Sequence, residues 1–118
     1  MADEITITTG VTVANGSLQV RGVTSSTKYD MATVIAPAPG GVTVGTSEET
    51  ISFGDVTPGW TEIVNLDDTN YVEFGFSTGV YGMVLPAGGS MVFKMNGLTL
   101  YAKADTASVN LQVTGISN

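Results

Sequence analysis

The amino-acid sequence predicts an all-β protein: an antiparallel β-sandwich or jelly-roll-like fold with about nine to eleven short strands. Apolar and polar residues alternate along most of the chain, which is typical of strands with one buried face. Turn-forming residues interrupt this alternation about every ten residues. Helix is disfavoured because Gly, Pro and β-branched residues recur too often, and only residues 102–108 leave room for a helical turn.

The first predicted element is a hairpin. Apolar residues alternate with polar ones on both sides of a turn, at Ile5, Ile7, Val11, Val13, Leu18 and Val20. Asn15-Gly16 lies between the two halves and favours a type I′ turn, because this dipeptide tolerates two positive φ angles. A further strand is predicted over residues 29–36. It runs into residues 37–41, Pro-Ala-Pro-Gly-Gly, which we predict to be a loop because proline lacks an amide donor for the ladder.

The middle of the chain continues the pattern. Alternation restarts at residues 42–44 and resumes at residues 51–53. Pro58-Gly59 then turns the chain into a strand over residues 60–66. Residues 67–70, Asp-Asp-Thr-Asn, form a turn because their side chains bond neighbouring backbone amides. Two more strands are predicted over residues 71–76 and 81–85, and the second ends in the Pro-Ala-Gly-Gly turn of residues 86–89.

The C-terminal region carries the clearest hairpin signal. Residues 91–95 and 98–102 both alternate, and Asn96-Gly97 lies between them, so the two segments are predicted to pair. A last strand over residues 109–113 has one apolar and one polar face and is expected to close the sheet. We expect a single β-sandwich domain over residues 1–118, with room for a short N-terminal arm over residues 1–8.

The composition argues against an enzyme. The chain contains no cysteine and no histidine, so it lacks a disulfide framework, the usual general base at neutral pH and the commonest ligands of transition metals. We therefore expect no catalytic residues, no cofactor and no metal. Glu48 and Glu49 are adjacent, so on a strand they face opposite sides and cannot act together as a glycosidase pair. They are interpreted as loop residues in solvent.

The charge balance bears on partners and location. Eleven acidic and four basic residues give a net charge of −7, which repels nucleic acid. The N-terminus lacks the features of a secretory signal, and no apolar run is long enough to span a membrane, so synthesis in the cytoplasm is expected. Only 13% of the residues are charged. A largely uncharged surface favours association with other copies or with a large partner, although Thr-rich β-proteins can be weakly charged without associating.

Three groups of residues are candidate sites. Asp67, Asp68, Asn70 and Glu73 offer oxygen ligands for calcium, or simply form a turn. Trp60, the only tryptophan, could stack on a sugar or a partner, or lie in the core. Ile5 and Ile7 form an edge strand, or pair with the exposed edge of a neighbouring copy. We name Ile5, Ile7 and Trp60 as the candidate assembly interface.

The C-terminal half resembles small structural proteins of tailed phages. The resemblance is carried by residues 65–75, Asn-Leu-Asp-Asp-Thr-Asn-Tyr-Val-Glu-Phe-Gly, by the turn of residues 85–89, by Leu-Tyr-Ala-Lys-Ala at residues 100–104 and by the strand of residues 109–113. It covers about residues 60–116. The resemblance implies a virion component, a capsid decoration (cement) protein that binds the major capsid protein on the capsid exterior and forms a homo-oligomer, a trimer. The acidity suits a surface that faces away from packaged DNA.

The predicted function is therefore a phage structural protein that stabilises the outer capsid shell, without nucleic-acid or membrane partners. A head or tail fibre module, or a carbohydrate- or receptor-binding β-module that uses Trp60 and the tyrosines, is the alternative, because one fold serves many functions. A third hypothesis is a small hydrolase that uses carboxylates.

Overall fold

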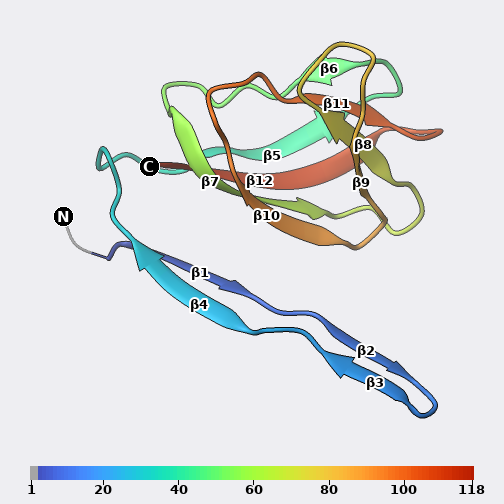
Figure 1. Cartoon of the computed structure of the whole chain (residues 1–118). Helices are drawn as coiled ribbons and strands as arrows, with labels where there is room; N and C mark the ends of the chain where they lie inside the picture. Colours follow the sequence, from blue (N-terminus) through green and yellow to red (C-terminus); the bar gives the residue numbers. More distant parts are fainter. Residues whose placement is uncertain (1–2) are drawn as a thin grey trace. The chain divides into compact units, whose positions relative to one another are not determined.

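The computed structural model describes residues 3–118, and they form two compact units, the first ending at Thr33 and the second running over Val34–Asn118. The described residues contain twelve strands and no helix (Figure 1), so none of their segments is a helix able to cross a membrane. The predicted all-β, antiparallel class is confirmed, with more strands than the nine to eleven expected. The first unit is separate because β1 to β4 pair only with one another.

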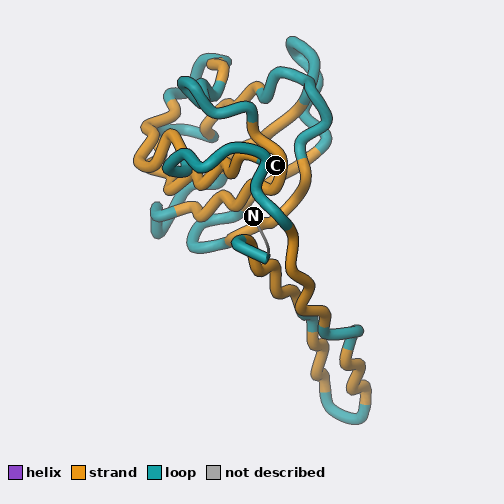
Figure 2. Tube along the Cα trace, turned by 90° about the vertical axis from the view of Figure 1, so that its left-hand side faces the viewer, coloured by secondary structure: helices purple, strands orange, loops and turns teal. Residues whose placement is uncertain are grey.

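The first unit is a two-stranded ribbon, which we call the arm. Its strands are β1 (Ile5–Thr9), β2 (Thr12–Asn15), β3 (Leu18–Arg21) and β4 (Ser25–Tyr29). β1 pairs with β4 and β2 with β3, all antiparallel, and Figure 2 shows these strands as orange segments joined by short loops. The arm is therefore much longer than the segment of residues 1–8 that the sequence suggested as an arm.

The second unit contains eight strands in two sheets. They are β5 (Ala38–Val44), β6 (Glu49–Thr50), β7 (Pro58–Asn65), β8 (Val72–Gly75), β9 (Met83–Leu85), β10 (Ser90–Lys94), β11 (Tyr101–Ala104) and β12 (Val109–Ser117). The sheet orders are β10-β7-β12-β5 and β6-β11-β8-β9. Every connection except β8 to β9 leads to the other sheet. With β5 counted as the first strand, the orders 6-3-8-1 and 2-7-4-5 are those of an eight-stranded jelly roll.

One hydrophobic core joins the two sheets. Alternate residues of β12 and of β8 are fully buried, among them Leu111 and Phe74, which have no exposed surface. These residues belong to a single cluster to which both sheets contribute, so the arrangement is sandwich-like. All core residues lie at position 35 or later. The second unit therefore has a core that includes no residue of the arm.

The segment around the first prolines was predicted wrongly. Residues 37–41 were expected to be a loop, yet β5 begins at Ala38, and the Ala38–Pro39 peptide bond is cis. Residues 29–36 were expected to be a strand, yet β4 ends at Tyr29. Proline is tolerated here because β5 is an edge strand that pairs only with β12, so a missing donor costs little on its open side.

Both Asn-Gly turns also differ from prediction. Asn96-Gly97 does not close a hairpin, because β10 pairs with β7 whereas β11 pairs with β6 and β8; the turn links the two sheets instead. At the arm tip, Asn15 pairs with Leu18, so Gly16 and Ser17 form the loop and only Gly16 has a positive φ, 58°. This matches a turn with glycine first rather than type I′. A helical turn was considered over residues 102–108, but this segment begins inside β11, which spans Tyr101–Ala104.

Candidate functional site

The arm is continuous across a β-bulge. Thr9 pairs with Ser25 and Thr12 pairs with Arg21, so residues 10 and 11 on one strand face residues 22 to 24 on the other. The extra residue makes this a bulge, and the Gly22 amide closes it by donating to the Val11 carbonyl at 2.7 Å. The extra residue lies on the returning half of the ribbon, between β3 and β4. The outgoing half, β1 and β2, therefore keeps a single alternation of side chains along its whole length.

The alternation gives the arm one apolar face. We define this face by Ile7, Val11, Val13, Leu18 and Val20. Val13 pairs directly with Val20, and they are 46% and 51% exposed, while Leu18 is 56% and Val11 69% exposed. The opposite face carries small and polar residues, such as Ala14 paired with Gln19. An exposed row of this kind is expected of a surface that another molecule covers.

Charge is distributed unequally between the two units. Residues 5–29 contain no carboxylate side chain and two cations, Arg21 and Lys28, which pair with Thr12 and Thr6 on the polar face. Residues 34–118 contain eight carboxylates and two lysines, a net charge of −6. The strands of the arm are thus basic with an uncharged apolar face, whereas the first unit as a whole, which also contains Asp3, Glu4 and Asp30, has a net charge of −1, and the jelly roll is acidic.

The structure places the three predicted interface residues in different settings. Ile5 lies on the same face of the arm as Ile7, but it is only 4% exposed and offers no free surface. Ile7 is half-buried. Trp60 lies on β7 opposite Lys94, on the outer side of its sheet, since Thr61 and Ile63 are the buried neighbours. Trp60 is half-buried there, and it belongs to the second unit, whereas Ile5 and Ile7 belong to the first.

Four exposed apolar residues of the arm were missed as candidates. Val11, Val13, Leu18 and Val20 had been identified as strand residues, with no role in binding. The sequence contains a usable signal. Every second residue on each side of the turn is apolar, and residues 5–29 include no acidic residue. Their exposure could not be predicted because alternation does not reveal whether a partner sheet covers the apolar face.

The jelly roll has an exposed apolar area of its own at β8 and β9. We define this β8–β9 patch by Phe76, Val80 and Val84, which are 38%, 62% and 57% exposed. Val84 pairs with Glu73 across the two strands. Val80 forms an isolated bridge with Ser77, and its backbone lies directly against Gly75. The patch therefore forms at the β8–β9 connection, with a carboxylate beside it.

A second carboxylate holds the β8–β9 connection in place. Glu48 Oε1 accepts hydrogen bonds from the Tyr81 hydroxyl at 2.6 Å and from the Gly79 amide at 2.7 Å. Both bonds lower the pKa of Glu48, and the bond to Glu48 is the main cause that raises the pKa of Tyr81 to about 12. The neighbouring Glu49 accepts from the Gly45 amide. Glu49 is exposed to solvent as expected, but it lies on β6 rather than in a loop, and each glutamate also accepts a hydrogen bond from a backbone amide.

The Asp67 turn is explained without a ligand. Asp67 Oδ2 accepts from the amides of Thr69 at 3.0 Å and Asn70 at 2.6 Å, and these bonds lower the pKa of Asp67. Asn65 is 1% exposed and accepts from the Asp67 amide at 2.9 Å. The carboxylates are thus used in turn formation. Among residues 3–118, no group of three or more acidic side chains has the arrangement of a metal site.

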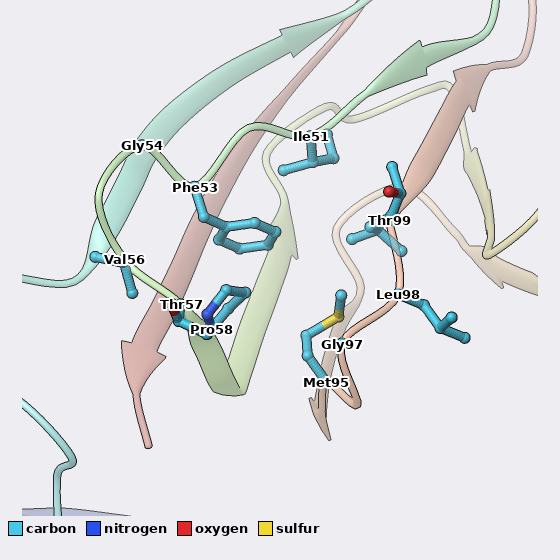
Figure 3. Close-up of a pocket in the computed structure, with 11 residues that line it drawn as sticks. Ile51, Phe53, Gly54, Val56, Thr57, Pro58, Met95, Gly97, Leu98 and Thr99 are labelled. Atoms are coloured by element: carbon cyan, nitrogen blue, oxygen red, sulfur yellow. The ribbon is translucent and has the colours of Figure 1, made fainter.

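A cavity of about 330 Å³ opens at one end of the jelly roll (Figure 3). It is lined by the connection from β6 to β7 and by the connection from β10 to β11. Phe53 and Met95 point into it from opposite sides, and the exposed Leu98 lies at its edge. The lining is mixed, with Thr57 and Thr99 beside the apolar side chains, and it includes no titratable side chain, so the lining offers no acid–base group.

Comparisons of the chain with protein-family models, with curated proteins and with solved structures gave no match.

Proposed function

We propose that the protein is a structural component of a phage virion, which binds the outside of the capsid shell, stabilises it and associates with copies of itself. The observation that carries this proposal is the exposed apolar face of the arm. A two-stranded ribbon is at best marginally stable alone in water, so an arm of this length is expected to act by lying against another molecule. A decoration protein requires binding surfaces but no catalytic site.

The jelly roll supports the same proposal. This architecture is common among viral capsid domains, although a fold alone does not identify a function. The acidic second unit suits a position on the shell exterior, since a net charge of −6 on residues 34–118 would be repelled by packaged DNA. The proposed partners are the major capsid protein and further copies of this chain, arranged as a trimer on the resemblance described above.

The test uses particles produced from the genome that encodes the chain. Deletion of the gene is expected to give particles that lose their DNA at a lower temperature than complete particles, and purified protein added back is expected to restore the difference. Electron cryomicroscopy of both particles would show the extra density on the shell. Complete particles that lack the chain, or that carry it only on the tail, would contradict the proposal.

A carbohydrate- or receptor-binding module is the second candidate, and the position of aromatic side chains favours it. Trp60 lies on the outer side of one sheet, and Tyr71, 37% exposed, lies near the carboxylates of Asp105 and Glu73. The Tyr71 ring beside these carboxylates suits sugar stacking and hydroxyl recognition, and the half-buried Trp60 offers part of a second ring on the other sheet. Glycan-array binding that is lost in Trp60→Ala or Tyr71→Ala, but kept in Leu66→Ala, would support this function over capsid decoration.

A further inference from the structure

We propose that the outer face of the sheet β6-β11-β8-β9 binds a neutral saccharide. We name this surface the tyrosine face and define it by six residues: Tyr71, Glu73, Tyr81, Tyr101, Lys103 and Asp105. The inference deepens the second candidate function, the carbohydrate-binding module, and rests on it for the class of ligand. It does not depend on capsid binding.

Strand register places the centre of the tyrosine face on one side of the sheet. On β11, Ala102 is fully buried in the core, so its neighbours Tyr101 and Lys103 point to the outer side. Lys103 pairs with Glu73 of β8, and Tyr101 pairs with Gly75. A phenol ring, an ammonium group and a carboxylate therefore occupy neighbouring positions of the outer face.

Two further tyrosines extend this surface. The Asp105 amide donates to the Tyr71 carbonyl at 3.1 Å, and the Asp105 carboxylate, with a smaller contribution from Glu73, lies near enough to raise the pKa of Tyr71. Tyr81 also lies near Glu73, and it donates its hydroxyl to Glu48 at 2.6 Å. The tyrosine face thus contains all three tyrosines of the second unit.

Gly75 allows the chain to bring Tyr81 close to Tyr101. A Cβ at Gly75 would overlap the Val80 carbonyl and would lie 3.1 Å from the Cα of Tyr81. The β8–β9 connection therefore crosses directly over the outer side of Gly75, which is the residue that pairs with Tyr101. Two tyrosines from distant parts of the sequence meet on the outer face as a result.

The polar groups at the centre are available to a ligand. Within residues 3–118, the side chains of Glu73, Tyr101 and Lys103 form no hydrogen bond or ion pair, although Glu73 and Lys103 pair on adjacent strands. A carboxylate accepts hydrogen bonds, an ammonium donates them, and a phenol hydroxyl does both. This mixture suits a ligand that carries several hydroxyl groups.

The chemistry of the face favours a neutral saccharide among such ligands. Sugars offer apolar C–H surfaces that pack on tyrosine rings and hydroxyl groups that form charge-assisted bonds to carboxylates. With Glu48 included, three carboxylates and one ammonium give the surface a net charge of −2, which repels acidic glycans. Lys103 at the centre disfavours a basic peptide.

The experiment titrates the full chain with defined oligosaccharides and follows its backbone amide signals by nuclear magnetic resonance. The probes are short neutral oligomers of glucose, mannose and N-acetylglucosamine, and hyaluronan oligomers as the acidic comparison. We expect at least one neutral oligomer to shift the signals of β8 and β11 and to leave those of β7 in place, while hyaluronan shifts neither. Added salt should change the affinity little because the ligand carries no charge.

Two variants test the site itself. Tyr101→Ala removes a ring, and Glu73→Gln removes a charge while it keeps the shape of the side chain, so each is expected to weaken binding about tenfold. Glu62→Gln makes the same change at an exposed position on the outer face of the other sheet and should bind like the wild type. Glu73→Gln keeps the test valid if Tyr101→Ala does not fold.

The contrary results are distinct from one another. Binding that is lost in Trp60→Ala but kept in Tyr101→Ala and Glu73→Gln would overturn the inference and leave the carbohydrate function in place, because Trp60 lies on the other sheet. A wild type that binds no neutral oligomer, or that binds only tetralysine at low salt, would overturn the inference and the second candidate function together. Failure to bind capsids would affect neither and would count against the decoration function alone.

Discussion

Asn65 is the buried polar residue that holds three segments of the second unit together. Its side-chain amide donates to the carbonyls of Asn70 at 3.0 Å and of Leu85 and Pro86 at 3.2 Å each. Its oxygen accepts from the Asp67 amide. A buried amide with all its bonds made stabilises a specific loop arrangement, whereas the loss of its donors leaves carbonyls unsatisfied.

Replacing this amide by a carboxylate tests that role. Asn65→Asp removes the three donated bonds and buries a charge, so we expect the free energy of unfolding to fall by about 3 kcal/mol. Gln112→Glu makes the same chemical change at an exposed position and is expected to change stability by less than about 0.5 kcal/mol. Urea unfolding of both variants measures the difference. Equal effects would show that Asn65 holds nothing in place.

Gly115 lies where β12 passes Phe53 and Ala38. A Cβ at this position would overlap the Phe53 ring and would come within 2.8 Å of the Ala38 carbonyl oxygen. We expect Gly115→Ala to destabilise the protein by about 2 kcal/mol because the Phe53 ring and the backbone around the Ala38 carbonyl must both shift. Gly41→Ala on β5 meets nothing within 4 Å and is the matched control, expected to be neutral or slightly stabilising. Thermal unfolding distinguishes the two.

The Glu48–Tyr81 hydrogen bond predicts a pH dependence at both ends of the scale. The pKa of Tyr81 is raised from 10.0 to about 12, chiefly by the bond to Glu48, so this contribution to stability is present below pH 10 and is lost as pH rises towards 12. The pKa of Glu48 is lowered, chiefly by the same bond. Its contribution is present above the ordinary carboxyl pKa and is lost as pH falls through the lowered value.

Ultraviolet titration of the tyrosines checks this assignment. The wild type is expected to show a component that titrates near pH 12, and Tyr81→Phe should remove it while Tyr101→Phe leaves it in place. Glu48→Gln should shift that component to lower pH because the partner carboxylate is gone. A titration curve unchanged in Tyr81→Phe would assign the late component to another residue.

At the scale of elements, the arm and the sheets differ in how they are held. β2 and β3 pair only with each other, and their residues are all exposed. β7 and β12 lie inside a four-stranded sheet and alternate buried residues along their length. Local stability follows the number of buried contacts that must break for a segment to open.

Hydrogen exchange should therefore separate the two regions. At low protein concentration, where copies are apart, the amides of β2 and β3 are expected to exchange far faster than those of β7 and β12. At high concentration, the arm should become protected because a second copy covers it. Arm protection that does not depend on concentration would mean that the ribbon is stable without a partner.

At the scale of the whole molecule, the core cluster of the second unit lies entirely within residues 35–113, and the arm contributes no residue to it. We expect a shortened chain of residues 34–118 to remain folded, with cooperative unfolding and an intact near-ultraviolet circular dichroism spectrum, since no residue of this cluster is removed. It should not self-associate, because it lacks the exposed apolar face of the arm. Loss of cooperative unfolding would show that the arm is part of the fold.

The sequence by itself determined the fold class and most strand positions. Alternation predicted the strands around Val13, Val72, Met91 and Leu111, because one-sided burial leaves a period of two in the sequence. The absence of cysteine and histidine, also read directly from the sequence, removes disulfides and the two commonest side-chain ligands of transition metals. Properties of this kind depend only on neighbours along the chain.

Tertiary structure alone decided which strands pair and which apolar faces stay uncovered. The Asn96-Gly97 turn links the two sheets although its local pattern predicts a hairpin, because β10 pairs with β7 and β11 pairs with β8. Val13 on the arm and Val113 in the core belong to equally alternating segments, yet one is 46% exposed and the other 0%. Pairing and burial depend on residues distant in sequence, and a local pattern does not encode which partner covers a face.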